Sequence, residues 1–147
     1  MFGYSHPHKS FICDAEYAAA DIFQSKDQKA IRKGQQVFYK FYQDEGWKFI
    51  QKRFPRYVIF HEMLQKGVAG VNDQDVCRVR YPQNVLRSLI EGEPKDELVS
   101  AMQAVLEIVM NQSGLSPKDF GVFGSMLHGF HHPDFSDIDL AVYGREE

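Results

Sequence analysis

The chain contains little cysteine. Only Cys13 and Cys77 occur among its 147 residues, and neither belongs to a Cys-x-x-Cys pair. This spacing does not match a zinc-binding or dithiol redox motif. We expect both thiols to be buried and inert. A disulfide between them is the alternative, and the reducing cytoplasm in which we place the chain argues against it.

Other features of common protein classes are also missing. No apolar run approaches the length needed to cross a bilayer, and the N-terminal residues lack the charged-then-apolar order of a secretory signal. These absences predict a cytoplasmic chain with no membrane partner. The sequence also lacks a Gly-Lys-Ser/Thr phosphate loop. Ser125 stands in Gly-Ser-Met-Leu-His rather than in the Gly-x-Ser-x-Gly elbow of a hydrolase.

What the chain does contain is typical of a globular protein. Hydrophobic residues make up 44% and charged residues 25% of it, and 12 Phe and 7 Tyr supply a packed core. Its length has room for one ordinary domain or two small ones. The mixture of helix-like and strand-like segments favours the α+β fold class.

Charge is unevenly distributed, although the net charge is only −3. Residues 26–56 contain nine Lys or Arg against three acids and are interleaved with aromatic residues, whereas residues 91–147 contain three bases against eleven acids. A basic, aromatic stretch can hold RNA or a phosphate-bearing acceptor. The simpler interpretation, which we favour, is a solvated charged face over an aromatic core, with Trp47 and Phe49 packed inward.

Helical patterns are clearest in the second half of the chain. We expect the longest helix over residues 95–112, ended by Ser113-Gly114. Its apolar face should consist of Leu98, Met102, Val105, Leu106, Val109 and Met110. A shorter helix is predicted to start at Asp44-Glu45-Gly46-Trp47 and to run to about Arg53, and another is predicted over residues 83–90.

Strand patterns are weaker. Residues 57–60 favour a strand because all four are β-branched or aromatic residues with high strand propensity. Residues 11–23 fit either a helix or a strand. Gly67 and Gly70 indicate a loop.

The stretch from Phe120 to Gly144 is the most informative part of the sequence. A short apolar run ends at Gly124, and Ser125 stands where a helix would begin. Glycine permits a tight turn and a close approach by an anion, while the free N–H groups at a helix start suit phosphate. The segment therefore predicts a phosphate-binding turn.

Two carboxylates follow on the next apolar run, Asp137-Ile138-Asp139-Leu140. Because side chains alternate along a strand, Asp137 and Asp139 are expected on one face. Neighbouring carboxylates repel each other and are best tolerated beside a divalent cation, and Mg²⁺ prefers oxygen ligands. A phosphate turn and a metal pair together favour phosphoryl or nucleotidyl transfer. The competing interpretation is an ordinary strand with two solvent-facing acids and a loop glycine.

These residues resemble the signature of the polymerase-beta-like nucleotidyltransferase superfamily. Gly124-Ser125 is followed, after eleven residues, by Asp137-Ile138-Asp139-Leu140, and Ser136 before the first acid matches a common form of the motif. The resemblance implies that Gly124, Ser125 and Ser136 bind the nucleotide. It also implies that Asp137 and Asp139 are catalytic and hold Mg²⁺ or Mn²⁺. A nucleoside monophosphate would then pass from an NTP to an acceptor hydroxyl.

One departure from the family concerns a third carboxylate, which lies there on a further strand. The sequence stops at Glu147, and Glu146 and Glu147 lie too close to Asp139 to take its place. We therefore expect an inactive fragment of a longer enzyme, with its core incomplete at the C-terminus and an open sheet edge where a second copy can pair. A non-catalytic nucleotide- or RNA-binding module of the same fold is the alternative. The acceptor, whether RNA, protein or small molecule, stays open.

The helix-breaking run at residues 91–94 is the expected domain boundary. Residues 1–93 would form an accessory α+β domain, and residues 94–147 the first helix and strands of a nucleotidyltransferase core, a mixed sheet flanked by helices. The first part resembles a region that precedes such a core in archaeal proteins. The likeness rests on Tyr4-Ser5-His6-Pro7, Glu45-Gly46-Trp47, Pro55-Arg56-Tyr57-Val58 and Val79-Arg80-Tyr81-Pro82.

Three histidines, His128, His131 and His132, lie between the turn and the carboxylates. His131 and His132 are adjacent and would point apart, which is poor geometry for zinc. We expect structural histidines, with a contact to the nucleotide phosphates as the alternative.

Overall fold

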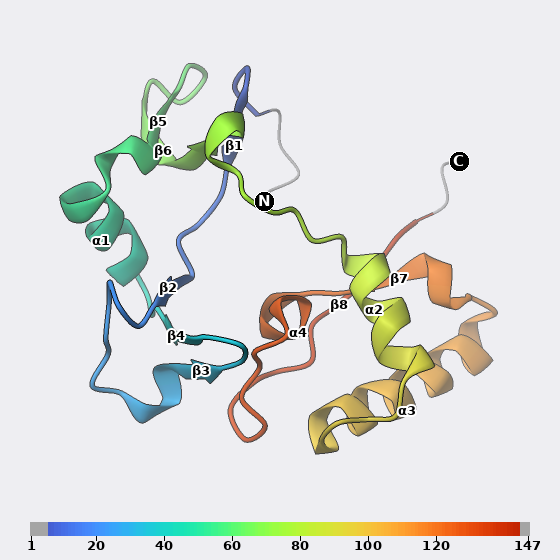
Figure 1. Cartoon of the computed structure of the whole chain (residues 1–147). Coiled ribbons are helices and arrows are strands. Elements are labelled where there is room, and N and C mark those ends of the chain that lie inside the picture. Colours follow the sequence, from blue (N-terminus) through green and yellow to red (C-terminus); the bar gives the residue numbers. More distant parts are fainter. Residues whose placement is uncertain (1–5, 145–147) are drawn as a thin grey trace. The chain divides into compact units, whose positions relative to one another are not determined.

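The computed structural model describes residues 6–144, which combine short antiparallel sheets with four α-helices. The predicted α+β class is therefore confirmed. The chain divides into two units, an N-terminal unit, Met1–Val79, and a C-terminal unit, Arg80–Glu147 (Figure 1). Among the described residues, no helix is both long enough and apolar enough to span a bilayer. The predictions made for Tyr4-Ser5 and for Glu146-Glu147 lie outside the described residues.

The boundary between the units lies earlier in the chain than residues 91–94. Helix α2, Pro82–Glu91, belongs to the C-terminal unit, where Leu86 is fully buried in the same cluster as Leu106. The Gly92–Pro94 break therefore separates two helices that share one core. The assignment of residues 1–93 to an accessory domain stays a prediction.

The N-terminal unit contains two three-stranded antiparallel sheets. One has the order β1-β6-β5, formed by Ser10–Ile12, Lys66–Asn72 and Val58–His61. The other has the order β2-β4-β3, formed by Tyr17–Ala19, Val37–Lys40 and Ile31–Lys33. Residues 11–23, which fitted either structure, thus contribute to two short strands.

The loop predicted at Gly67 and Gly70 is wrong, because both glycines lie inside strand β6. A Cβ atom at Gly70 would collide with the Ile59 side chain and come within 2.7 Å of the Phe11 carbonyl oxygen. Glycine here allows close approach of the neighbouring strands rather than a turn. Composition alone does not distinguish these two uses of glycine.

Helix α1 spans Glu45–Arg53, which agrees with the helix predicted to start within residues 44–47 and to run to about Arg53. Gly46 lets it pack against the backbone of Ala15, where a Cβ atom would overlap the carbonyl oxygen. Phe41 is buried, and the Phe41 and Phe49 ring centroids lie 5.1 Å apart. Phe41 and Phe49 therefore pack together, as the favoured interpretation of the basic stretch expects for Phe49, whereas Trp47 is half-buried. Short 3-10 turns occupy Gln28–Ala30, Pro55–Tyr57 and Asp73–Asp75.

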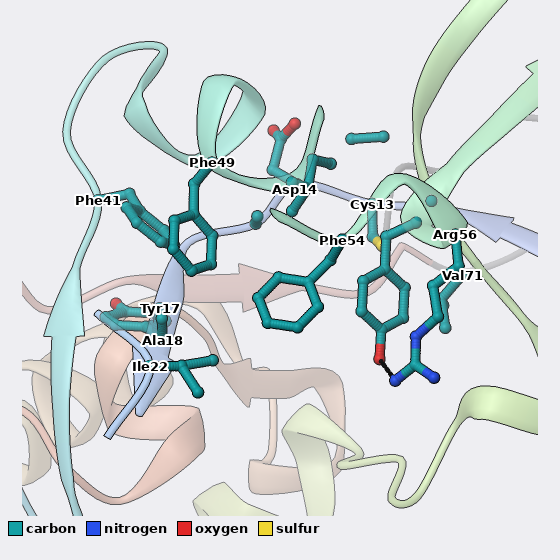
Figure 2. Close-up of a pocket in the computed structure, with 15 residues that line it drawn as sticks. Cys13, Asp14, Tyr17, Ala18, Ile22, Phe41, Phe49, Phe54, Arg56 and Val71 are labelled. Carbon is teal, nitrogen blue, oxygen red and sulfur yellow. Dashed lines mark hydrogen bonds between the residues drawn. The ribbon is translucent and has the colours of Figure 1, made fainter. Parts of the chain in front are cut away.

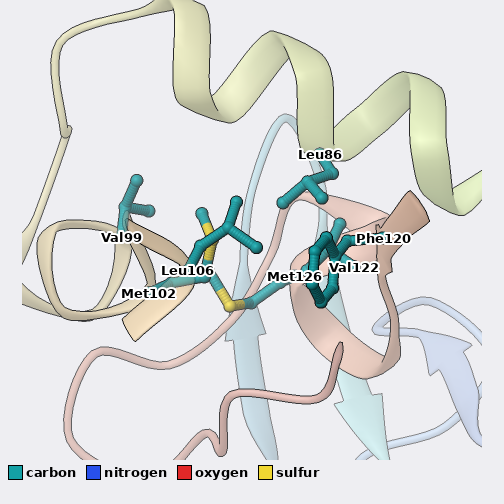
Figure 3. Packing of buried hydrophobic residues seen from close by; sticks show 7 residues of the cluster. All are labelled: Leu86, Val99, Met102, Leu106, Phe120, Val122 and Met126. Atoms are coloured by element: carbon teal, nitrogen blue, oxygen red, sulfur yellow. The ribbon is translucent and has the colours of Figure 1, made fainter. Parts of the chain in front are cut away.

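The C-terminal unit packs three helices around a two-stranded antiparallel sheet. Besides α2 it contains α3 (Glu97–Ser113), a 3-10 turn (Pro117–Asp119), β7 (Phe120–Val122), α4 (Gly124–His128) and β8 (Leu140–Val142). Figure 3 shows the buried cluster that joins them, formed by Leu86, Val99, Met102, Leu106, Phe120, Val122 and Met126. Ile138 and Leu140 pack against this cluster from the strand side.

Helix α3 begins after Asp96, which accepts a hydrogen bond from the Val99 amide, and ends at Gly114 with φ of +69°. The predicted helix is confirmed, but its predicted apolar face is partly wrong. Val105 and Val109 remain 43% and 37% exposed. The buried stripe instead follows Val99, Met102 and Leu106, which recur every three or four residues.

Candidate active site

The turn between β7 and α4 is formed by Gly124. Its φ is +57°, a left-handed value that residues with a Cβ atom rarely adopt. A Cβ atom there would also overlap Oδ2 of Asp139. The predicted phosphate turn and one of the predicted metal ligands therefore lie in direct contact, and glycine is the residue that leaves room for the carboxylate.

The backbone aligns these two segments. β7 and β8 pair antiparallel, with Val122 opposite Leu140, and the Phe123 amide donates a 2.8 Å hydrogen bond to the Asp139 carbonyl. The pairing thus extends one step past the end of the sheet. It places Asp139 beside the turn before the chain enters α4.

The predicted alternation around the acids is observed. Asp137 and Asp139 are exposed, whereas Ile138 and Leu140 are half-buried and pack against the core. Both acids lie just before β8 rather than within it. Two half-buried apolar residues therefore alternate with two exposed carboxylates along this strand extension.

Two serines form a second link between the halves of the motif. The Ser125 hydroxyl donates to Ser136 Oγ at 3.0 Å, and the His132 amide donates to the same oxygen at 2.8 Å. Ser125 is only 8% exposed. Because Ser136 Oγ accepts twice, its own hydrogen is available to donate elsewhere.

The N–H groups at the start of α4 are the expected phosphate contacts. The first amides of a helix have no intrahelical acceptor, and no side chain caps this end. The helix is only five residues long, so its dipole adds little. Any anion here would depend on direct N–H contacts.

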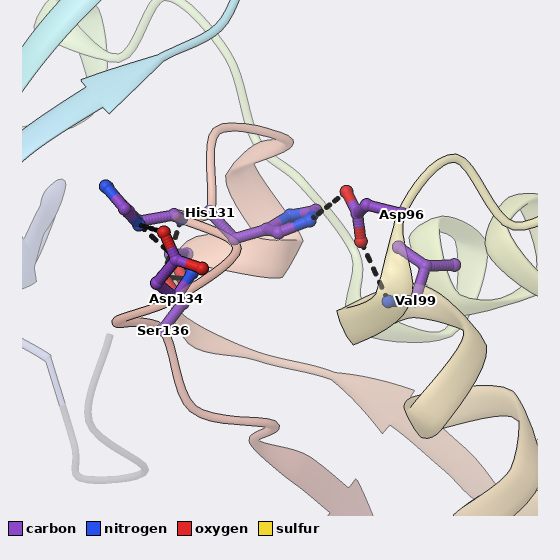
Figure 4. A network of polar contacts seen from close by, with 7 residues as sticks. Asp96, Val99, His131, Asp134 and Ser136 are labelled. Atoms are coloured by element: carbon purple, nitrogen blue, oxygen red, sulfur yellow. Dashed lines mark hydrogen bonds and ion pairs between the residues drawn. The ribbon is translucent and has the colours of Figure 1, made fainter.

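The loop between the turn and the acids is attached to α3 through His131. Nε2 of His131 lies 2.8 Å from Asp96 Oδ2, as Figure 4 shows, and the side chain is 3% exposed. Nδ1 of His131 is also buried and has no hydrogen-bond partner among the described residues. The structural role predicted for this histidine therefore fits the observed contact.

Asp96 connects that contact to the helix. Burial by itself would raise the pKa of its carboxyl group, but hydrogen bonds from the Val99 amide and His131 together lower the pKa below its usual value. The capping signal before α3 is readable from sequence as an Asp ahead of an apolar helix. Its pairing with a histidine 35 residues later is not.

His128 is the titratable side chain within α4 itself. Its ring stacks on Phe130 with a centroid distance of 5.3 Å. Burial lowers the pKa of His128, and the nearby positive charge of Arg80 lowers it further. His128 is therefore neutral at pH 7. Arg80, whose guanidinium lies 3.4 Å from the Leu127 carbonyl, is the charged group beside this helix.

Asp137 and Asp139 are the predicted metal ligands within the described part of the chain. Among residues 6–144, no group of three or more His, Cys, Asp or Glu side chains is arranged to hold a metal ion. The structure thus brings together Gly124, Ser125, Ser136 and Asp139, and it exposes Asp137 two residues before Asp139. Their roles in nucleotide and metal binding stay predictions.

Comparison with known proteins agrees with the motif. The chain is 23% identical over 146 residues to an uncharacterized protein of Methanocaldococcus jannaschii, covering 97% of this chain and 43% of that protein. The chain thus spans less than half the length of the curated relative that it matches. No solved structure gives a significant match. Residues 102–147 match the family model of the nucleotidyltransferase domain, so the resemblance predicted from the Gly-Ser turn and the Asp pair is confirmed for this part of the chain.

Proposed function

We propose that the full-length protein is a metal-dependent nucleotidyltransferase whose site includes Gly124, Ser125, Ser136, Asp137 and Asp139. The observation that carries this proposal is the direct contact between the Asp139 carboxylate and the Gly124 turn. A metal ligand beside a set of free backbone N–H groups suits a polyphosphate, whose oxygens need both a cation and hydrogen-bond donors.

Each residue has a distinct role in this proposal. The backbone amides at Gly124 and Ser125 hold the terminal phosphates of the NTP. Ser125 also holds Ser136 in place, and the spare hydroxyl hydrogen of Ser136 is directed to a phosphate oxygen. Asp137 and Asp139 supply carboxylate oxygens for Mg²⁺ or Mn²⁺, and these oxygen donors fit either ion.

The reaction joins an acceptor to the nucleotide. The acceptor hydroxyl loses its proton to solvent as its oxygen forms a bond to the α-phosphorus, the bond from that phosphorus to the bridging oxygen breaks, and pyrophosphate leaves. The bound metal would supply charge neutralisation on the phosphates. The chain's own residues fix the triphosphate at the turn, so that the α-phosphate is oriented before attack.

The test uses the full-length protein and replaces the acids one at a time. Asp137→Asn and Asp139→Asn should each lower nucleotide transfer at least about 100-fold, equivalent to about 2.7 kcal/mol of transition-state stabilisation. Asp134→Asn is the matched control, because Asp134 lies in the same loop with its side chain 76% exposed. Full activity in both test variants would remove the metal role.

A binding module without chemistry is the second candidate. It is favoured by the absence, among the described residues, of a third acid near the pair. On this proposal the site binds the nucleotide or RNA through the turn without catalysing transfer. A further strand bearing an acid in the longer polypeptide would favour the enzyme, and its absence would favour the binding module.

The cellular compartment and the partners of the protein are also part of the proposal. Cys13 and Cys77 are both free thiols, which suits the reducing cytoplasm. The outer edge of β8 offers backbone groups to a strand from a second copy, which would give a homo-oligomer. The acceptor is RNA, a protein or a small molecule.

A further inference from the structure

The N-terminal unit contains a cavity of about 400 Å³. Small-molecule sites typically occupy roughly 300–1,000 Å³ and combine apolar walls with a few polar groups. This cavity has that composition, with Phe41, Phe49, Phe54, Tyr57 and Ile50 among its walls and Cys13, Asp14 and Arg56 among its polar side chains. We propose that it binds a planar aromatic compound that carries a negatively charged group. The proposal concerns a different site from the Gly-Ser turn and does not depend on nucleotidyl transfer.

The aromatic side chains form a continuous wall. The Phe49 ring lies 5.1 Å from Phe41 and 5.5 Å from Phe54, and Phe54 lies 6.4 Å from Tyr57. Figure 2 shows the Phe49 and Phe54 rings turned toward the same space. Tilted rings at these separations present both faces and edges, with which another aromatic ring can stack.

The charge of the ligand follows from Arg56. Its Nη2 donates a 2.9 Å hydrogen bond to the Tyr57 hydroxyl, and its guanidinium lies 4.9 Å from the centre of that ring. These contacts hold the guanidinium against the wall, and because Arg56 is exposed its remaining donors are open to solvent and to a ligand. Within residues 6–144, no carboxylate forms an ion pair with Arg56. An anionic group on the ligand would supply the ion-pair partner of the Arg56 guanidinium.

The other charged side chains near the cavity are consistent with a negatively charged ligand. Asp14, the acid in the lining, is exposed, and in Figure 2 its carboxylate points away from the Phe54 ring. Residues 26–56, which supply most of the aromatic wall, hold nine basic residues against three acids. The segment that supplies most of the wall thus carries an excess of positive charge, which favours an anionic ligand over a cationic one.

The reactivity of Cys13, which lines the cavity, can report whether a ligand is bound there. It is a free, half-buried thiol, and burial raises its pKa, so it reacts slowly at neutral pH. Cys77 is also free, but it is exposed, so the expectation that both thiols are buried is wrong for it, and it does not line the cavity. A ligand in the cavity should therefore shield Cys13 and leave Cys77 unaffected.

The first experiment titrates the whole chain with two fluorescent probes, anionic anilinonaphthalenesulfonate and uncharged phenylnaphthylamine. Both should bind with saturation at one site. Arg56→Gln should weaken the anionic probe about tenfold and the uncharged probe less than about twofold, as expected for one lost charge-assisted contact. Arg53→Gln is the matched control, because Arg53 lies over the Phe49 ring at 5.9 Å but does not line the cavity.

The second experiment labels both cysteines with a maleimide and follows each by mass spectrometry. Saturating anionic probe should slow labelling of Cys13 at least about fivefold and leave Cys77 unchanged, which places the probe in the cavity whatever the variants do to folding. Displacement of the probe by aromatic carboxylates or by nucleoside monophosphates would identify the source of the ligand. Failure of the probe to bind, stronger displacement by a fatty acid, equal effects of the two arginine variants, or unprotected Cys13 would each overturn the proposal.

Discussion

The two units of this chain differ in how deeply their large apolar side chains are buried. Among residues 6–144, the seven largest fully buried side chains all belong to the C-terminal unit, whereas several aromatic residues of the N-terminal unit line a cavity of about 400 Å³. Deep burial suits a unit that holds a turn and two carboxylates in register. Side chains that border a cavity have fewer packing partners and contribute less stability each, and they leave room for a ligand.

The largest expected effect compares one phenylalanine from each unit. Phe120→Ala, at a position 1% exposed, should lower the free energy of unfolding by about 3–5 kcal/mol. Phe54→Ala should cost about 1–2 kcal/mol, because the ring already borders open space. Urea unfolding followed by circular dichroism gives both values. Equal losses would mean that the units do not differ in packing.

A second comparison separates the two constraints on Gly124. Gly129 also has a positive φ, +74°, but a Cβ atom there would have nothing within 4 Å. Gly129→Ala should therefore lower the free energy of unfolding by only about 1 kcal/mol, the strain of a left-handed backbone at a residue with a Cβ atom. Gly124→Ala should lower the free energy of unfolding by about 2–3 kcal/mol, because its Cβ atom must also displace the Asp139 carboxylate.

Metal affinity provides a second measurement for the same pair. Gly124→Ala should abolish Mn²⁺ binding to the chain by moving Asp139, and Gly129→Ala should leave it unchanged. Equal stability losses and equal metal affinities in the two variants would refute the contact between the turn and the acid.

The smallest effect concerns the attachment of the loop to α3. The pKa of Asp96 is below its usual value, so its interactions stabilise the fold at pH values above about 4. That stabilisation is lost as pH falls through the lowered pKa of the folded state. Asp96→Asn should therefore remove about 0.5–1 kcal/mol at pH 7 and flatten the stability profile below pH 4, as pH-dependent urea unfolding would show.

The control for that loop is Asp134→Asn, because this side chain is 76% exposed. It should leave both the stability and its pH dependence unchanged. A profile for Asp96→Asn that parallels the unmodified chain would show that the Asp96 contacts are unimportant.

The sequence was most informative where local chemistry determines local structure. The alternation of Asp137, Ile138, Asp139 and Leu140 appears in the structure as exposed and half-buried positions in turn. The limits of α1 also follow from local residues, since the helix ends two residues before Pro55.

The sequence was least informative where contacts join distant residues. Gly70 reads as a loop residue until Ile59 is seen against it. The exposure of Val105 depends on which side of α3 receives β7 and α4, which helical periodicity does not specify. The contact between Asp96 and His131 spans 35 residues and has no local pattern.

The central claim is that the Gly124 turn and the Asp137–Asp139 pair form one cation-and-phosphate site, and Mn²⁺ tests it most directly. In nuclear magnetic resonance spectra of this chain with a non-hydrolysable NTP, roughly millimolar Mn²⁺ should broaden the amide signals of Gly124, Ser125 and Asp139. Asp139→Asn should abolish this broadening, and Asp134→Asn should preserve it. Broadening that survives in Asp139→Asn, or that spares Gly124 and Ser125, would contradict the account.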